Sequence, residues 1–120
     1  MARTFLLIGA LSGVVGVVLG AFGAHGLRGR LSPDMIAVFE TAVRYHMYHA
    51  LALVLVSALM ARIDGWLMTA AGWSFTIGIV LFSGSLYALA LTGVSVLGAL
   101  TPLGGLAFVL GWAFLAVAAL

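Results

Sequence analysis

The chain contains no cysteine and no lysine, and only three of its 120 residues are acidic. The lack of cysteine excludes disulfides, thiol redox chemistry and cysteine-bound metals. No basic patch interleaved with aromatic residues is present, which argues against a nucleic-acid partner. The sequence also lacks a phosphate-binding loop, a nucleophile paired with a base and a metalloprotease motif. We therefore expect no enzymatic activity, no catalytic residue, no bound metal and no cofactor.

Charge is scarce throughout the chain. Only 7% of the residues are charged and 65% are hydrophobic, with a mean hydropathy of +1.31. A soluble domain has about 25% charged residues, so water is not the main solvent here. Since a spanning helix needs about 20 apolar residues, we predict an all-α polytopic membrane protein, one domain folded as an antiparallel bundle of four transmembrane helices. The predicted spans are residues 4–24, 42–62, 66–91 and 95–119, with an interfacial loop and helix start over 25–41.

Glycines follow a regular spacing in the first span. They recur alternately every four and every three residues, which lines them along one seam of a helix. Small residues in such a seam let a neighbouring backbone approach closely, and this is how membrane helices gain packing energy. The helix-packing glycines predicted on this basis, with a further pair in the last span, are Gly9, Gly13, Gly16, Gly20, Gly23, Gly104 and Gly105.

A long second helix is predicted from Pro33 to about Arg62, because Ser32 can cap it and proline suits the first helical position. Such a helix is about 45 Å long and exceeds the ~30 Å hydrocarbon core. Counting back from Arg62 carries the segment from Arg44 to His49 into the membrane or to its edge. Ionisable groups there normally face the protein interior. The opposite arc of the helix, expected to face lipid, comprises Ile36, Val43, Met47, Ala50 and Val54.

The last span has two open interpretations. Pro102 either kinks a continuous helix over 95–119 or begins a shorter span, with residues 93–100 left as an interfacial segment. We favour the kink. Alternation of the spans places both termini at one membrane face, where a group of tryptophans resembles an interfacial aromatic anchor. These tryptophans are Trp66, Trp73 and Trp112.

Most of the polar side chains are expected at the opposite face. The predicted polar cluster, a possible ligand or proton site, comprises His25, Glu40, Arg44, Tyr45, His46, Tyr48, His49, Ser83 and Tyr87. One interpretation is a hydrogen-bonded cluster that fixes helix register, with Glu40 and Arg44 paired one turn apart. A second is a proton, ion or small-solute path in an oligomer, since histidine titrates near neutral pH. A third is a metal or haem site built from His25, His46 and His49.

Several segments resemble a small membrane family catalogued as domain of unknown function 423. They are Gly20-Ala-Phe-Gly-Ala-His25-Gly-Leu27, Arg44-Tyr-His-Met-Tyr-His49-Ala-Leu-Ala-Leu53, Leu81-Phe-Ser-Gly-Ser-Leu-Tyr87, Thr101-Pro-Leu-Gly-Gly105 and Gly111-Trp112. The resemblance implies a four-helix integral membrane protein and supplies no activity. It also implies that position 46 accepts glutamine, which weakens a mechanism in which His46 must titrate or bind metal. Other members often carry positive charge after the second span and at the C-terminus, and this resemblance favours cytoplasmic termini.

Together these patterns indicate a non-catalytic structural or accessory component of the cell membrane. Its expected partners are the lipid bilayer and either further copies of itself or the subunits of a larger membrane complex.

Overall fold

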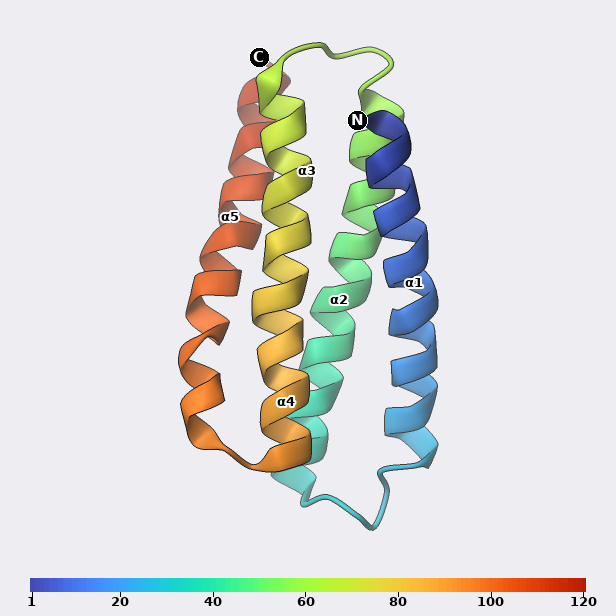
Figure 1. Cartoon of the computed structure of the whole chain (residues 1–120), viewed down its shortest axis with the longest axis vertical. Helices are drawn as coiled ribbons and strands as arrows, with labels where there is room; N and C mark the ends of the chain where they lie inside the picture. Colours follow the sequence, from blue (N-terminus) through green and yellow to red (C-terminus); the bar gives the residue numbers. More distant parts are fainter.

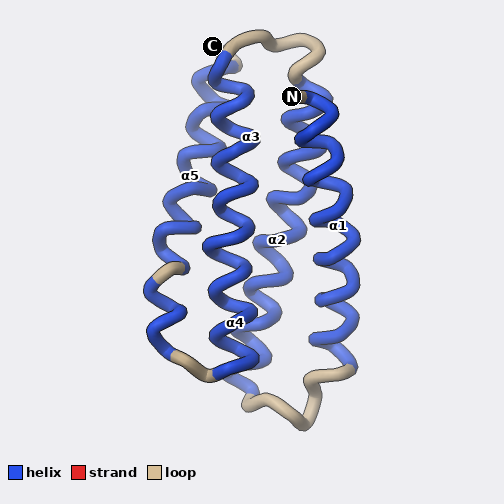
Figure 2. Tube along the Cα trace, viewed as in Figure 1, coloured by secondary structure: helices blue, strands red, loops and turns tan.

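The computed structural model describes all residues, 1–120, and contains helices and turns only, with 84% of the chain helical. The elements are α1 (Ala2–His25), α2 (Pro33–Leu59), α3 (Trp66–Gly78), the π-helical turn η1 (Ile79–Ser83), α4 (Gly84–Thr92), the 3₁₀ helix η2 (Ser95–Ala99) and α5 (Thr101–Ala118). Since α3, η1 and α4 run on without a break, four helical segments are long and apolar enough to cross a membrane. Figures 1 and 2 show them as an antiparallel bundle.

The bundle is elongated and flattened, with extents of 48 × 25 × 18 Å. Both termini and the α2–α3 turn lie at one end, which we call the terminal end (Figure 1). The α1–α2 loop and the α4–α5 connection lie at the other, which we call the loop end. Helix α1 packs chiefly on α2, while α5 packs on α3 and η1. Helix α2 and the α3–η1–α4 segment therefore form the middle of the molecule, and α1 and α5 flank it.

Local sequence sets the helix ends near the loop end. Ser32 caps α2 as predicted, since its hydroxyl accepts a hydrogen bond from the Met35 amide at 3.2 Å and Pro33 opens the helix. Gly93 ends α4 in the left-handed conformation with φ of 72°, a geometry that glycine adopts without a steric penalty.

The expectation of one kinked helix through Pro102 is wrong. The chain forms η2 over Ser95–Ala99 and begins α5 at Thr101, with Pro102 in its first turn. Proline lacks the amide hydrogen that an interior helical position must donate, and the first turn is where that loss has no cost. Residues 93–100 thus form a separate connecting segment.

The glycine seam of α1 lies against α2. A Cβ added at Gly9 would stand 3.0 Å from the Ala50 carbonyl oxygen, and one at Gly23 would meet the Phe39 ring at 2.8 Å. Gly16 and Gly20 face Met47 and Val43 in the same way. Gly13 has no neighbour within 4 Å of that position.

This seam overturns the expected orientation of α2. Val43, Met47 and Ala50 were expected to face lipid, but they pack against α1, and Ala50 is buried. The apolar arc is the one that can approach a glycine-lined backbone closely, so it turns inward.

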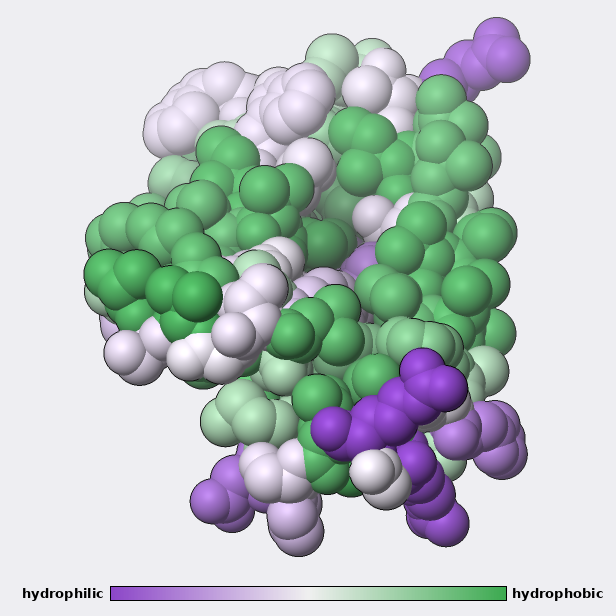
Figure 3. Space-filling model, turned by 60° about the horizontal axis from the view of Figure 1, so that its bottom comes forward, coloured by the Kyte–Doolittle hydropathy of each residue, from purple (hydrophilic) through white to green (hydrophobic).

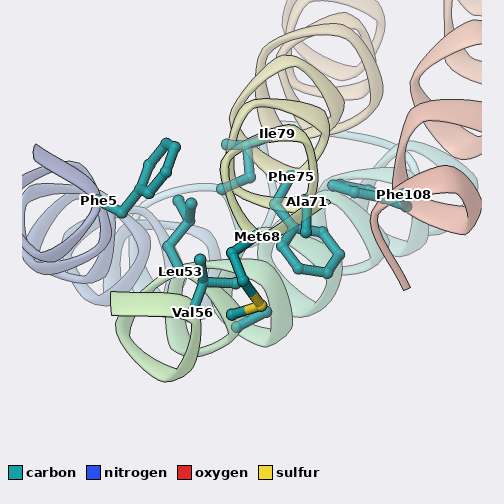
Figure 4. Close-up of a cluster of buried hydrophobic side chains, with 9 residues drawn as sticks. Phe5, Leu53, Val56, Met68, Ala71, Phe75, Ile79 and Phe108 are labelled. Carbon is teal, nitrogen blue, oxygen red and sulfur yellow. The ribbon is translucent and has the colours of Figure 1, made fainter. Parts of the chain in front are cut away.

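The main apolar core lies between the middle of the bundle and its terminal end. Figure 4 shows Phe5 of α1 and Phe108 of α5 reaching toward Phe75 and its neighbours on α3 from opposite sides. Leu53 and Val56 of α2 complete the contact. Because lipid tails are as apolar as these side chains, the core is held by close packing rather than by removal from water.

A π-turn lets α5 approach the middle of the bundle. Gly104 lies directly on the main chain of Phe82 in η1, with no room for a Cβ. The neighbouring Gly105 is less confined, because a Cβ there would stand 3.8 Å from the Phe82 ring. The widened turn and the bare glycine together bring α5 into contact at this level.

The surface of the bundle separates polar ends from apolar flanks. Figure 3 shows hydrophilic residues gathered at the loop end and hydrophobic residues covering the flanks of the helices. Exposed side chains on α1 include Leu7, Val14 and Val17. Apolar flanks with polar ends are what a bilayer requires of a spanning bundle.

Candidate functional site

The polar side chains buried in the bundle gather between α2, α4 and α5. His49 on α2 is their centre and is buried at 4% exposure. Its Nδ1 lies 2.6 Å from the Tyr45 carbonyl oxygen one turn earlier. Its Nε2 accepts a hydrogen bond from the indole Nε1–H of Trp112 on α5 at 3.2 Å.

These two partners fix the state of the His49 ring. A carbonyl oxygen can only accept a hydrogen bond and an indole N–H can only donate one. The proton must therefore sit on Nδ1 and Nε2 must be bare, which is a neutral imidazole. Both nitrogens are occupied, so neither is free to bind a metal ion or pass on a proton unless a hydrogen bond breaks.

The His49 ring also stacks on Phe108. The ring centroids are 3.5 Å apart and the planes differ by 6°. Phe75 and Trp112 surround the same imidazole with tilted or edge-on rings. His49 thereby joins α2 to α5 by one hydrogen bond and one stacked ring, whereas the main packing of α5 is on α3 and η1.

His46 forms a second link, from α2 to α4. Its Nδ1 lies 2.8 Å from the Tyr87 hydroxyl. The main chain of Ser12 on α1 lies close to the same ring. Phe39 packs on the Tyr87 ring with centroids 5.1 Å apart. His46 therefore sits where three of the four spans meet.

Two hydroxyl contacts complete the buried set. Ser83 in η1 donates to the Ala42 carbonyl on α2 at 2.8 Å and is fully buried. Ser85 lies 2.7 Å from the Thr101 hydroxyl, which ties α4 to the start of α5. No buried side-chain nitrogen or oxygen lacks a hydrogen-bond partner. The buried polar groups therefore satisfy one another completely.

The structure divides the predicted cluster into an inner and an outer part. His46, His49 and Ser83 are buried and Tyr87 is half-buried, while the remaining five are exposed. The exposed members are His25, Glu40, Arg44, Tyr45 and Tyr48. His25 lies at the end of α1, so three imidazoles do not meet. None of the side-chain hydrogen bonds in the chain involves Glu40 or Arg44.

The outward position of Arg44 has a geometric cause. Val43 and Ala50 pack on α1, and His46 and His49 face α3–α5. The remaining arc of α2, which contains Arg44, is therefore left exposed. Side chains on a helix tilt toward its N-terminus, and the N-terminus of α2 is at the loop end. The Arg44 guanidinium is thus directed toward the headgroups rather than into the hydrocarbon.

Trp112 was misplaced by sequence reasoning. It was expected among the tryptophans of an aromatic anchor at the terminal face, but it points to His49 and packs on Phe75 with centroids 4.9 Å apart. Phe108 was missed as well. The available signal was spacing, since Gly104, Phe108 and Gly111 share one face of α5 and are all buried.

An open groove lies beside this inner cluster, between α2 and α5. It has a volume of about 640 Å³. We call it the aromatic groove, and its walls are Tyr45, Tyr48, His49, Phe82, Gly105, Phe108, Val109 and Trp112. The Tyr45 and Tyr48 rings lie edge to face at its rim, 5.8 Å apart. Neither tyrosine hydroxyl is hydrogen-bonded within the chain.

Known proteins resemble this chain over nearly its whole length. Residues 19–105 match the family model described as protein of unknown function DUF423. The chain is 50% identical over 118 residues to the UPF0382 membrane protein YwdK of Bacillus subtilis, covering 98% of this chain and 96% of the relative. A UPF0382 membrane protein of Staphylococcus epidermidis is 48% identical with the same coverage, and one of Staphylococcus haemolyticus is 46% identical over 96% of this chain and 93% of its own length.

No solved structure matches the chain. The matched region includes His46, His49, Ser83 and Tyr87, whereas Phe108 and Trp112 lie beyond it. The relatives are named as membrane proteins, in agreement with four helices of spanning length and composition. The chain therefore belongs to the DUF423 family of membrane proteins, whose function is unknown.

Proposed function

We propose that this protein is a non-catalytic structural or accessory component of the membrane. The observation that carries the proposal is the complete internal satisfaction of the buried polar groups. A site that transfers protons or binds a substrate keeps at least one group free for it. Here the imidazoles and hydroxyls are used to join one helix to another, which supports a role in holding the bundle in register.

A proton or ion path finds less support in this geometry. Both nitrogens of His49 are engaged, and spans α1, α3–α4 and α5 contain no acidic residue apart from the chain terminus. A metal or haem site finds less support too, because His25 lies away from His46 and His49.

Reconstitution into liposomes tests the proposal. Wild-type protein and a His49→Gln variant are compared under a pH gradient with a pH-sensitive dye inside the vesicles. We expect both to leak protons at the rate of protein-free vesicles. A wild-type flux that His49→Gln abolishes, in a variant with unchanged helicity, would contradict the structural role and support an ion path.

We further propose that the protein associates with copies of itself or with other membrane subunits. The outer helices support this, since only 17% of the spanning window of α1 and of α5 is buried within the chain. Chemical crosslinking in native membranes, followed by mass determination of the products, tests it. Monomers alone at every crosslinker concentration would contradict the proposal.

We place the protein in the cell membrane with cytoplasmic termini. Arg3, Arg62 and the amine of Met1 at the terminal end support this orientation by a small excess over Arg28 and Arg30 at the loop end. Fusion of a fluorescent protein to the C-terminus is expected to give fluorescence, whereas fusion of alkaline phosphatase there is expected to give no activity. The reverse pattern would overturn the orientation.

A further inference from the structure

The aromatic groove is open to the membrane and its rim carries unused polar groups. Helix α5 packs mainly on α3 and η1, and the groove lies between α2 and α5 beside the contact of His49 with Phe108 and Trp112. Gly105, Val109 and Trp112 form its far wall, one above another on a single face of α5. A volume of about 640 Å³ is within the range of small-molecule sites in proteins.

The groove is lined mainly by aromatic and apolar side chains, with the two tyrosine hydroxyls as its free polar groups. Phe82, Phe108 and Val109 offer nothing to a polar ligand, and His49 is already fully hydrogen-bonded. The Tyr45 and Tyr48 hydroxyls are free at the rim. A mainly apolar groove with free phenol hydroxyls fits an amphiphile whose tail lies against the groove wall and whose head is directed toward the loop end, where Arg44 lies.

A positively charged side chain close to the two tyrosines favours an amphiphile with an anionic head group. Arg44 lines a smaller neighbouring hollow between α1 and α2, together with Glu40, rather than the aromatic groove itself. It lies one turn before Tyr48 on the same helix and is exposed without a hydrogen-bonded partner. The depth of Arg44 in the bundle can be taken from its neighbour Val43, which packs on Gly20 of α1. Gly20 lies five residues, or about 7 Å, from the end of α1 at the loop end, and the arginine side chain is long enough to cover this distance. Arg28 and Arg30 add positive charge in the adjacent loop.

We propose that the aromatic groove binds one acyl chain of an anionic phospholipid. The Arg44 guanidinium and the Tyr48 hydroxyl hold the lipid phosphate. A guanidinium pairs with phosphate through two parallel N–H bonds, and a free phenol donates a further one. Glu40, one turn from Arg44 in the other direction, opposes the anion and limits the preference. The inference is independent of the proposed structural role.

Trp112 provides a probe inside the groove. A Trp66→Phe/Trp73→Phe protein keeps Trp112 as its only tryptophan, and it is reconstituted in vesicles of phosphatidylcholine with phosphatidylglycerol. In parallel series either lipid is replaced by its form brominated in the middle of the acyl chain, and quenching of Trp112 fluorescence is measured. We expect brominated phosphatidylglycerol to compete for the groove about fivefold better than brominated phosphatidylcholine at equal mole fraction.

Substitutions test which residues give the preference for phosphatidylglycerol. Arg44→Gln is expected to bring the two lipids to parity, and Glu40→Gln to widen the difference. Arg62→Gln, an exposed arginine at the terminal end, is the matched control and should leave the preference unchanged. Val109→Phe, at an exposed wall position, should reduce quenching by both lipids because it fills the groove.

Equal quenching by both lipids in the parent protein would overturn the proposal. So would quenching by neither, which would mean that a second copy or another protein covers the groove. Helicity by circular dichroism confirms that each variant is folded before its quenching is compared. A proton flux in the liposome assay would contradict the proposed structural role without affecting this result.

Discussion

At position 49 the partners of the imidazole decide its chemistry. Tyr45 supplies an acceptor, Trp112 supplies a donor and Phe108 supplies a flat apolar face. A protonated ring would direct a second N–H at the indole N–H, and the Trp112 hydrogen bond would be lost. The site therefore favours the neutral ring by hydrogen-bond geometry.

This arrangement predicts the tautomer directly. Ring ¹⁵N chemical shifts of His49, measured in protein labelled on histidine and reconstituted in lipid at neutral pH, are expected to show a protonated Nδ1 and a bare Nε2. The exposed His25, whose ring has no hydrogen-bond partner in the chain, serves as the internal comparison. Two protonated nitrogens at His49 would contradict the hydrogen bonds described here.

The same residue is expected to contribute to stability. His49→Phe keeps an aromatic ring against Phe108 but removes the bond to Tyr45 within α2 and the interhelical bond to Trp112, and interhelical bonds in membranes average about 0.6 kcal/mol each. We expect a loss of about 1 kcal/mol in the free energy of unfolding, measured by denaturant titration in mixed micelles. Tyr48→Phe removes a hydroxyl without a partner in the chain, so it should change that free energy by much less.

At the scale of one element, α5 depends on a single glycine. Gly104→Ala would drive a methyl group into the Phe82 main chain, which cannot move aside as a flexible side chain would. Overpacking of this kind costs about 1–3 kcal/mol. Gly105→Ala, one residue later in the same turn, meets only ordinary contact and gains helix propensity.

The two variants form a matched pair. We expect Gly104→Ala to lower the thermal midpoint in detergent and to weaken Trp112 contact with His49, seen as a shift in tryptophan emission. Gly105→Ala should leave both unchanged or raise the midpoint. Equal behaviour of the two variants would show that α5 does not approach η1 as closely as described.

The glycines along α1 also differ in how much space surrounds them, so they should differ in their tolerance of alanine. Gly9 is confined by the Ala50 carbonyl and by Leu53, whereas Gly13 has open space around it. Gly9→Ala is therefore expected to destabilise the α1–α2 pair, and Gly13→Ala to be tolerated. Denaturant titration of both variants, beside the parent, measures the difference.

At the scale of the whole molecule, the bundle consists of two helical hairpins. The side-chain hydrogen bonds between them are few, namely Ser83 to Ala42, His46 to Tyr87 and Trp112 to His49. Ring contacts such as Tyr45 on Phe82 and the apolar core near the terminal end complete the interface. Each hairpin has spans long enough to insert by itself, and helices inserted separately can then associate.

Two fragments, 1–62 and 63–120, are therefore expected to reassemble when co-expressed. A tag on one fragment should retain the other during purification in mild detergent. A double variant, His49→Phe with Ser83→Ala, should lower the recovered partner several-fold, because it removes two of the three side-chain hydrogen bonds that join the fragments. Recovery that is unaffected by the double variant would show that these bonds do not hold the halves together.

Much of this molecule follows from its sequence by itself. The number of spans, the start of α2 at Ser32-Pro33, the end of α4 at Gly93 and the family are all readable from hydropathy, capping chemistry and motif. These features depend on local backbone chemistry and on the length of a bilayer, which act on each segment separately.

Only the tertiary structure decided which face of each helix turns inward. The lipid side and the core side are equally apolar in a membrane, so the pattern along α2 did not separate Val43 and Ala50 from true lipid contacts. Packing against the α1 glycines settled it, and that choice turned Arg44 outward and His49 toward Trp112. Close approach between backbones is a property of two helices together, and no single stretch of sequence contains it.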